Sequence, residues 1–225
     1  MSRAYRGKID YVNDETGAFG REYFSVTVFD DGTRTLRCLC EMDHVNLVRD
    51  VTYTVNADFR PIDCFVRVVN QGKFVGSGWF RFTDSMAEAE VHTAADGRTR
   101  QRHDTPGRVN LFGSHPIAID VWKCAHTKTE RPGQVQRVDN CMSSSPVENG
   151  ASGPLLFPKF YDMIYRGPEK VTVASGTYDC ERFAWATGTG RTLDLYTVPG
   201  DYLPVRTLVP ERKRRYELVE FEKLR

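Results

Sequence analysis

Hydrophobic and polar residues alternate with a period of two along most of the chain. Residues 24–28 alternate before the turn Asp30-Asp31-Gly32, and residues 36–40 continue the alternation on the return segment. Such runs between turn signals are typical of strands with one buried face. The sequence therefore predicts a long series of short antiparallel strands. The further expected strands are residues 51–55, 65–69, 74–82, 87–93, 98–103, 117–126, 135–142, 171–174, 177–187, 192–198, 205–209 and 216–221.

Two glycines, Gly76 and Gly78, lie within the expected strand 74–82. Glycine inside a strand indicates a bend or the close approach of another backbone. A sheet with this many strands is expected to curl or close, because open edges invite aggregation. We therefore expect one all-β domain, residues 1–225, that forms a single antiparallel closed or strongly curled β-barrel of lipocalin-like shape.

Helix signals are few, so at most one or two short helices are expected. The best candidate is residues 158–166, where a short apolar stripe precedes Gly167-Pro168. Residues 143–154 are rich in serine, glycine and proline and are predicted to form a loop, either a lid or a plain surface connection.

The charges of the chain nearly cancel. Lysine and arginine number 31 and aspartate and glutamate 30, which gives a net charge of +1 and no overall field to attract nucleic acid or an anionic membrane. No apolar stretch follows the basic N-terminal residues, and none approaches the length of a membrane helix. The sequence thus predicts a cytoplasmic protein with neither nucleic acid nor a membrane as partner.

The six cysteines are scattered, and only Cys38-x-Cys40 forms a close pair. Residues two apart on a strand share a face, but a disulfide between them would be strained, so buried free thiols are expected. No C-x-x-C motif occurs, and the histidines form no H-x-H or H-E-x-x-H pattern. We therefore expect no metal and no cofactor.

The C-terminal part contains the segments 171–180, 200–206 and 216–218, which include Gly176-Thr177-Tyr178 and Pro204-Val205. It resembles uncharacterised bacterial β-barrel proteins of lipocalin-like shape, in which a late strand with Gly-x-(Tyr/Phe) and a Pro-Val hairpin close the barrel. The resemblance covers the last quarter of the chain. It implies a closed barrel that holds an apolar small molecule, and it transfers no catalytic residue.

The hairpin of residues 86–104 can pair in two registers. A two-residue loop would place Glu90 opposite His103, within a polar cluster on one face. A three-residue loop would instead place Glu90 opposite Arg102 and leave His103 on the other, less charged face. The second register is favoured because it gives Glu90 an opposite charge on a solvent face.

Residues 115–126 hold the most suggestive chemistry. As a strand, this segment would place Asp120, Trp122, Cys124 and His126 on one face. A carboxylate, an indole and an imidazole that line a cavity could bind a ring and move a proton. The competing interpretation is an ordinary solvent-facing strand. His115, which precedes a proline, is expected to be extended.

These features favour a barrel that encloses a hydrophobic, cyclic ligand and acts as a cofactor-free lyase, isomerase or dehydratase. The proposed acid and base are Asp120 with His115 or His103. The proposed ligand contacts are Trp122, Tyr178, Trp79 and His126. Two alternatives stay open: a carrier without catalysis, and a structural or assembly module that docks another protein. A homodimer is compatible with each.

Overall fold

The computed structural model describes residues 3–147, 149–186 and 192–224. Fifteen strands of these residues form one sheet, in the order β8-β7-β6-β5-β4-β3-β2-β1-β15-β14-β13-β12-β11-β10-β9. The strands are β1 (Arg3–Asn13), β2 (Gly17–Val28), β3 (Arg34–Met42), β4 (Leu47–Val55), β5 (Pro61–Asn70), β6 (Lys73–Phe82), β7 (Met86–Thr93), β8 (Gly97–Asp104), β9 (Leu111–Gly113), β10 (Val135–Ser143), β11 (Phe157–Val173), β12 (Gly176–Ala186), β13 (Thr192–Val198), β14 (Leu203–Val209) and β15 (Arg214–Lys223).

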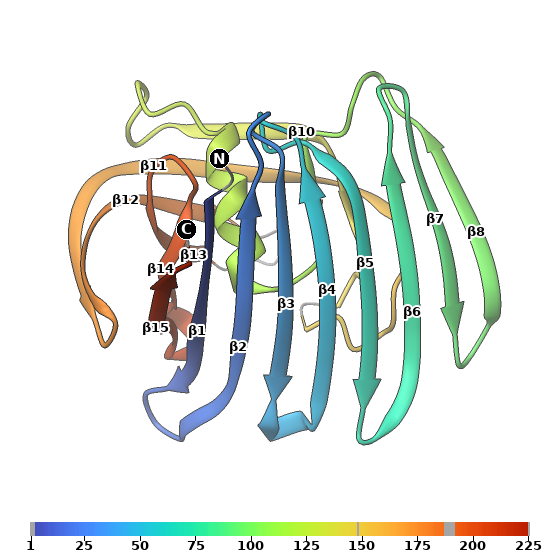
Figure 1. Ribbon diagram of the computed structural model, residues 1–225, viewed down its shortest axis with the longest axis horizontal. Coiled ribbons are helices and arrows are strands. Elements are labelled where there is room, and N and C mark those ends of the chain that lie inside the picture. The colour runs from blue at the N-terminus through green and yellow to red at the C-terminus, as the bar shows by residue number, and fades with distance from the viewer. Residues whose placement is uncertain (1–2, 148, 187–191, 225) are drawn as a thin grey trace.

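The sheet is strongly curled, which confirms the predicted fold class. In Figure 1, β1 to β8 form a curved row, and β11 and β12 cross behind it. All neighbouring strands are antiparallel except β9 and β10, which pair in parallel. The two ends of the sheet, β8 and β9, are not paired with each other in the described part of the chain.

The interior of the curl holds a short helical segment that the sequence analysis predicted as a strand. It consists of α1 (Ile117–Asp120) followed directly by the 3₁₀ helix η2 (Val121–His126), and it lies inside the curved sheet (Figure 1). The strand prediction for residues 117–126 is therefore wrong. Successive residues Ile117 to Cys124 are all buried, and this burial on every side fits a helix in the core better than a half-exposed strand.

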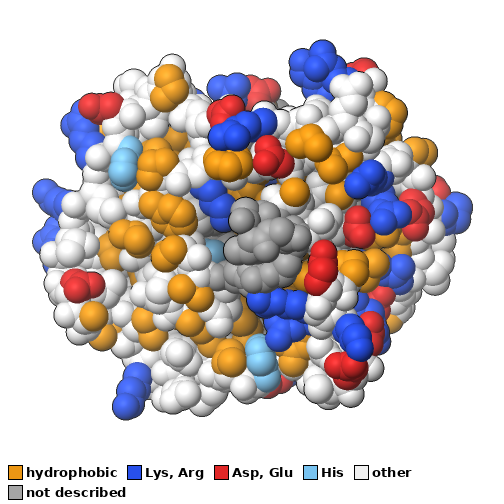
Figure 2. Space-filling model, turned by 180° about the vertical axis from the view of Figure 1, so that it is seen from behind, with side chains coloured by type: hydrophobic (Ala, Val, Ile, Leu, Met, Phe, Trp, Pro, Cys, Tyr) orange, Lys and Arg blue, Asp and Glu red, His pale blue; other side chains and the backbone are white. Residues whose placement is uncertain are grey.

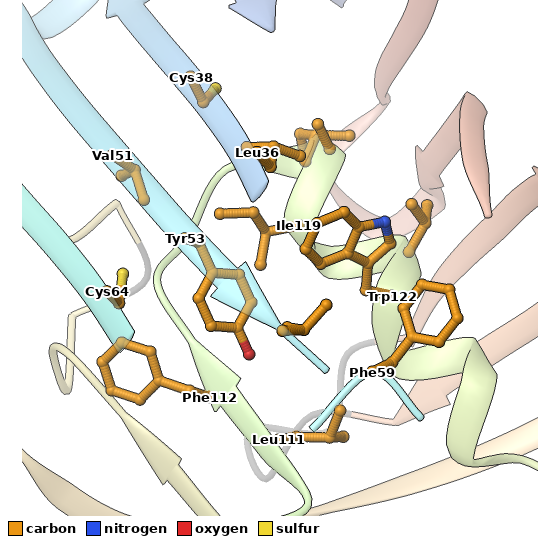
Figure 3. Packing of buried hydrophobic residues seen from close by; sticks show 14 of the residues in the cluster. Leu36, Cys38, Val51, Tyr53, Phe59, Cys64, Leu111, Phe112, Ile119 and Trp122 are labelled. Atoms are coloured by element: carbon orange, nitrogen blue, oxygen red, sulfur yellow. The ribbon is translucent and has the colours of Figure 1, made fainter. Parts of the chain in front are cut away.

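The helical segment fills the centre of the curl. Trp122 is 2% exposed, and its ring packs against Tyr53 at 5.7 Å and Phe59 at 5.8 Å between ring centres. Figure 3 shows Ile119 and Trp122 pointing towards Leu36 and Tyr53 from the sheet. Apolar side chains thus occupy the middle of the curl, so the chain does not form a barrel that is hollow throughout.

The loop between β10 and β11 lies over the gap between the two sheet ends. The side-chain amide of Gln101 on β8 accepts a hydrogen bond from the Leu156 N–H at 2.9 Å and donates one to the Leu156 carbonyl at 2.9 Å. A Cβ at Gly76 or Gly78 would come within 3.0 Å or less of Pro154. At these glycines it is the Pro154 side chain of the loop that packs closely against the strand, where the sequence analysis expected a bend or another backbone. The loop is thus part of the packed wall rather than a plain surface connection.

Two local predictions are corrected. Residues 158–166 belong to β11 and are not helical, because β10 and β12 pair with this segment on both sides. The 86–104 hairpin has a three-residue turn, as favoured, but its pairs are shifted by two residues, so that Glu90 lies opposite Arg100. Glu90 accepts hydrogen bonds from both Arg98 and Arg100 at 2.7 Å on the outer face.

The remaining strand predictions fall within observed strands, apart from residue 174, which lies in the turn after β11, and residue 187, which lies outside the described residues. Neither β1 nor β9 was predicted. All six cysteines are free and buried, as expected. Two further 3₁₀ helices, η1 (Asp43–Val45) and η3 (Pro210–Arg212), connect strands at one end of the curl. None of the described helices is long and apolar enough to span a membrane.

Candidate functional site

A cavity of about 710 Å³ remains on the side of the helical segment that faces away from Trp122. Side chains from both halves of the chain surround it, and Figure 2 shows lysine and arginine side chains gathered near the middle of the face seen from behind. Its lining consists of Tyr11, Phe19, Met42, His44, Gly113, His115, Ile117, Asp120, Lys123, Ser143, Ser145, Pro146, Val147, Asn149, Lys159, Tyr161, Trp185, Leu193, Val209, Arg212, Arg214 and Tyr216.

An ion pair on the helical segment forms part of the cavity wall. Lys123 donates to the Asp120 carboxylate, and the two side chains are only 3% and 9% exposed. The residues are three apart, which places them on the same face of a helix. Burial raises the pKa of Asp120, while the positive charges of Lys123 and Lys159 oppose the rise. Asp120 therefore carries a partner already and is not an isolated acid.

Two aromatic rings from neighbouring strands flank this ion pair. Trp185 of β12 lies 5.3 Å from Tyr161 of β11, ring centre to ring centre, in an edge-to-face arrangement. The Lys123 ammonium lies 3.8 Å from the centre of the Trp185 ring and 4.9 Å from that of Tyr161. Cations at these distances are attracted to the ring faces. The result is a wall of π surface with cationic groups resting on it.

The other wall repeats this combination with different residues. The guanidinium of Arg214 lies 4.7 Å from the Phe19 ring, and Phe19 contacts the Tyr216 ring edge-on at 5.9 Å. His44 packs edge-on against Phe19 at 5.0 Å and is within 3.3 Å of the Phe19 carbonyl through Nδ1. Burial raises the pKa of Tyr216, and the positive charge of Arg214 opposes the rise.

A buried glutamate holds the helical segment in place behind the cavity. Glu22 on β2 is fully buried and accepts hydrogen bonds from the Tyr11 hydroxyl at 2.6 Å, the Ile117 N–H at 2.9 Å and the Ala118 N–H at 2.8 Å. The two N–H groups belong to the first turn of the segment, where no intrahelical acceptor exists. Glu22 therefore fixes where the segment begins and, with it, where Asp120 points.

One cluster of metal-ligand types occurs among the described residues. Donor atoms of Glu22, Cys38 and Cys40 lie within 4.8 Å of one another. Both Glu22 oxygens already accept hydrogen bonds, and burial raises the pKa of both thiols. Since metals bind the thiolate form, these residues fit a hydrogen-bonded core network better than a metal site.

His115 lines the cavity with an unusual backbone. Its φ is +80°, in the left-handed region that favours glycine, and not the extended conformation expected from the following proline. Backbone strain of this kind persists only where the surrounding structure enforces it. His115 and Asp120 both line this cavity. Their roles as acid and base remain a prediction.

The other predicted site residues do not line this cavity. Trp122 points into the core, because the segment is helical and residue 122 does not share a face with residue 120. His103 is half-buried on β8, and Trp79 is 42% exposed on the outer face. Tyr178 packs against Phe221 at 6.4 Å.

His126 lies at a different, open pocket. Its Nε2 is 3.4 Å from the Phe59 carbonyl, and Arg34 and Tyr202 line the same pocket. Burial lowers the pKa of His126. The structure thus unites two of the seven predicted site residues, Asp120 and His115, in the cavity described above.

Sequence reasoning missed several residues that build the site: Glu22, Lys123, Lys159, Tyr161 and Trp185. For Lys123 a signal existed, because an Asp-x-x-Lys spacing between apolar residues is typical of a helix with one polar face. Tyr161 was missed because residues 158–166 were assigned to a helix. Glu22, Lys159 and Trp185 carried no local signal, since only the curl of the sheet brings them together.

The comparisons with known proteins indicate the fold alone. No family model matches the chain, and no curated protein matches it. A crystal structure of a beta-barrel-like protein of the domain of unknown function DUF1849 from Brucella abortus has a TM-score of 0.59 at 10% identity, covering 99% of this chain and 98% of that one. The chain thus has a β-barrel-like fold of a kind already seen in an uncharacterised protein.

Two further solved structures match with a TM-score of 0.32. One is a putative exported protein with a YmcC-like fold from Bacteroides fragilis, at 7% identity, and the other is a putative lipoprotein from Parabacteroides distasonis, at 9% identity. Each match covers 97% of this chain and 95% of the other. These two proteins are described as an exported protein and a lipoprotein, whereas the sequence analysis predicted a cytoplasmic location from the N-terminal residues alone. The cytoplasmic prediction is withdrawn.

Proposed function

We propose that the protein binds a small molecule with an apolar, ring-containing body in the cavity beside the helical segment. The observation that carries this proposal is the pair of rings, Trp185 and Tyr161, at the wall of a cavity of about 710 Å³. Volumes between roughly 300 and 1,000 Å³ suit drug-sized ligands. Aromatic walls supply contact area at low cost in side-chain entropy.

The proposal is tested with a matched pair of tryptophan variants. Native mass spectrometry of freshly purified protein detects a retained small ligand, and titration with aromatic probes gives affinities. Trp185→Ala is expected to lower affinity at least about tenfold, because one wall of the cavity is lost. Trp79→Ala, on the outer face, is the control and leaves affinity unchanged. Equal affinities in both variants and the unaltered protein would reject the cavity as the binding site.

Proton transfer on the bound ligand is a second candidate. It is favoured by the presence of Asp120 and His115 in the same cavity. Lys123 already pairs with the Asp120 carboxylate, so we assign the role of base to His115 and the role of stabilising a developing charge to the Asp120–Lys123 pair. His115→Ala is then expected to abolish exchange of ligand C–H protons with deuterated water while binding persists. Exchange that continues unchanged would remove His115 from this role.

A further inference from the structure

A groove of about 720 Å³ lies on the outer face of the sheet. It crosses β15, β1, β2, β3, β4 and β5, which are neighbours in the sheet, and β1 to β5 stand side by side in Figure 1. Five steps of about 4.8 Å between adjacent strands make the groove about 24 Å long. Among the described residues, the groove and the cavity beside the helical segment share no lining residue.

The register of the strands explains why this face is hollowed. One row of directly opposed outward side chains runs, strand by strand, through Glu222, Arg6, Ser25, Arg37, Thr52 and Phe65. Opposed side chains on one face of a sheet lie about 5 Å apart. Ser25 and Thr52 are short and stand on either side of the long Arg37 side chain. The row thus alternates long side chains with short hydroxyls, which leaves room for a ligand.

Two exposed aromatic rings stand at separate points of the groove. Tyr23 on β2 is 43% exposed, and Phe65 on β5 is 42% exposed. Three strand spacings, about 14 Å, separate them. Rings so far apart do not form the contiguous apolar core that a protein partner buries. Each ring instead offers a flat apolar face of its own.

The charges that line the groove cancel. Among the described residues, its lining has three cationic and three anionic side chains, which are Arg6, Lys8, Arg37, Asp50, Glu220 and Glu222. Arg6 pairs with Glu222 at 2.6 Å, and Lys8 and Asp50 pair with residues at the border of the groove. A balanced surface gives neither a polyanion nor a polycation an electrostatic advantage. The groove therefore favours an uncharged ligand.

Hydrogen-bonding groups fill the space between the two rings. The hydroxyls of Ser25 and Thr52 both donate and accept, and Arg37 between them donates. A matching ligand carries donors and acceptors at short intervals and also presents apolar faces to the rings. A chain of neutral sugars has both properties, because its hydroxyls donate and accept while the C–H groups of each sugar ring form an apolar face.

We propose that this groove binds a neutral oligosaccharide that lies across the strands. Sugar rings stack through their C–H faces on Tyr23 and Phe65. The hydroxyls of the sugars between them exchange hydrogen bonds with Ser25, Arg37 and Thr52. The ligand is a chain rather than a single sugar, because the two rings are about 14 Å apart. This site is independent of the cavity and of the ligand proposed for it.

Calorimetric titration with oligosaccharides of known charge tests the proposal. The neutral probes are cellohexaose, laminarihexaose, maltohexaose and chitohexaose, and hexagalacturonate is the charged comparison. At least one neutral hexasaccharide is expected to bind at least about tenfold more tightly than its disaccharide, because only the longer chain contacts both rings. Binding of none of the four neutral probes, tighter binding of hexagalacturonate, or equal affinity for the disaccharide would overturn the proposal.

Aromatic variants locate the binding site. Tyr23→Ala and Phe65→Ala are each expected to lower the affinity for the hexasaccharide at least about tenfold, because each removes one stacking face. Phe160→Ala is the matched control, since Phe160 on β11 is 43% exposed and lies outside the groove. An affinity that is unchanged in both groove variants, or lowered equally in the control, contradicts the assignment.

Sedimentation velocity tests the other occupant of such a face, a second copy of the chain. The unaltered protein and the Phe65→Ala variant are expected to have the same oligomeric state. Self-association that disappears in Phe65→Ala, together with no binding of the neutral hexasaccharides, would make the groove an interface between copies and overturn the proposal. The cavity and its proposed function would be unaffected by that result, because the two sites share no lining residue among those described.

Discussion

The two sides of the helical segment 117–126 have opposite surroundings: one packs in the core and the other lines a cavity. On the side of β3 to β5, Trp122 and Ile119 lie among apolar and aromatic side chains of the core, such as Leu36 and Tyr53. On the other side, Asp120 and Lys123 face a cavity. Apolar burial stabilises the fold, whereas a buried ion pair contributes little net stability, because desolvation of two charges offsets their attraction. The packed side thus accounts for stability, and the polar side is the natural place to look for function.

The largest expected effect on stability comes from removing a side chain of the segment that packs in the core. Trp122→Ala removes an indole that is 2% exposed and leaves a cavity between Tyr53 and Phe59. We expect a loss of about 3–5 kcal/mol in the free energy of unfolding, measured by urea denaturation. A loss under about 1 kcal/mol would mean that the segment contributes little to the core.

The second largest effect on stability is expected from removing one partner of the Asp120–Lys123 ion pair. Lys123→Met leaves the Asp120 carboxylate buried without its cation, and we expect a loss of about 3 kcal/mol. The double change Asp120→Leu with Lys123→Met removes both charges and is expected to restore stability to within about 1 kcal/mol of the original protein. If the double variant is as unstable as the single one, the pair contributes to folding and the contrast between the two sides fails.

The glutamate that positions the segment should make stability depend on pH. Burial raises the pKa of Glu22 above its ordinary value of 4.5, so the folded state keeps this proton to higher pH than the unfolded chain. Its contribution is fully present below pH 4.5 and is lost as pH rises through the raised folded pKa.

Glu22→Gln removes this titration and isolates its effect. The free energy of unfolding of the original protein minus that of the variant is expected to fall as pH rises above 4.5, with a slope of up to about 1.4 kcal/mol per pH unit. A difference that grows with pH would show that the hydrogen bonds from Tyr11, Ile117 and Ala118 outweigh burial and lower the pKa instead.

The smallest effect is expected outside the curl. Trp79→Ala changes a residue that is 42% exposed and lies opposite Phe65 on the outer face. We expect a loss of about 0.5–1 kcal/mol, since only a cross-strand contact is removed. A loss that matches that of Trp122→Ala would place part of the core on the outer face.

The strands were predictable because their signal is local. Alternation identified segments such as 36–40, 51–55 and 74–82, and Gly76 and Gly78 mark the place where the Pro154 side chain packs closely against the sheet. Residues 117–126 were not predictable in this way, because a short, mostly apolar segment fits a buried helix as well as a strand. That one error grouped Asp120 with Trp122, Cys124 and His126 on one face, whereas in the structure Trp122 is buried in the core and His126 lies at another pocket.

The sequence by itself determined the meander of strands, the buried free thiols and the face of the sheet to which most side chains point. Each of these follows from a period of two and from turn residues within a few positions. Only the tertiary structure decided that a helical segment fills the curl, that Glu22 holds this segment, and that Lys159 and Trp185 line one cavity. These residues lie on strands that are distant in sequence, and their proximity depends on how the whole sheet bends, which no local pattern encodes.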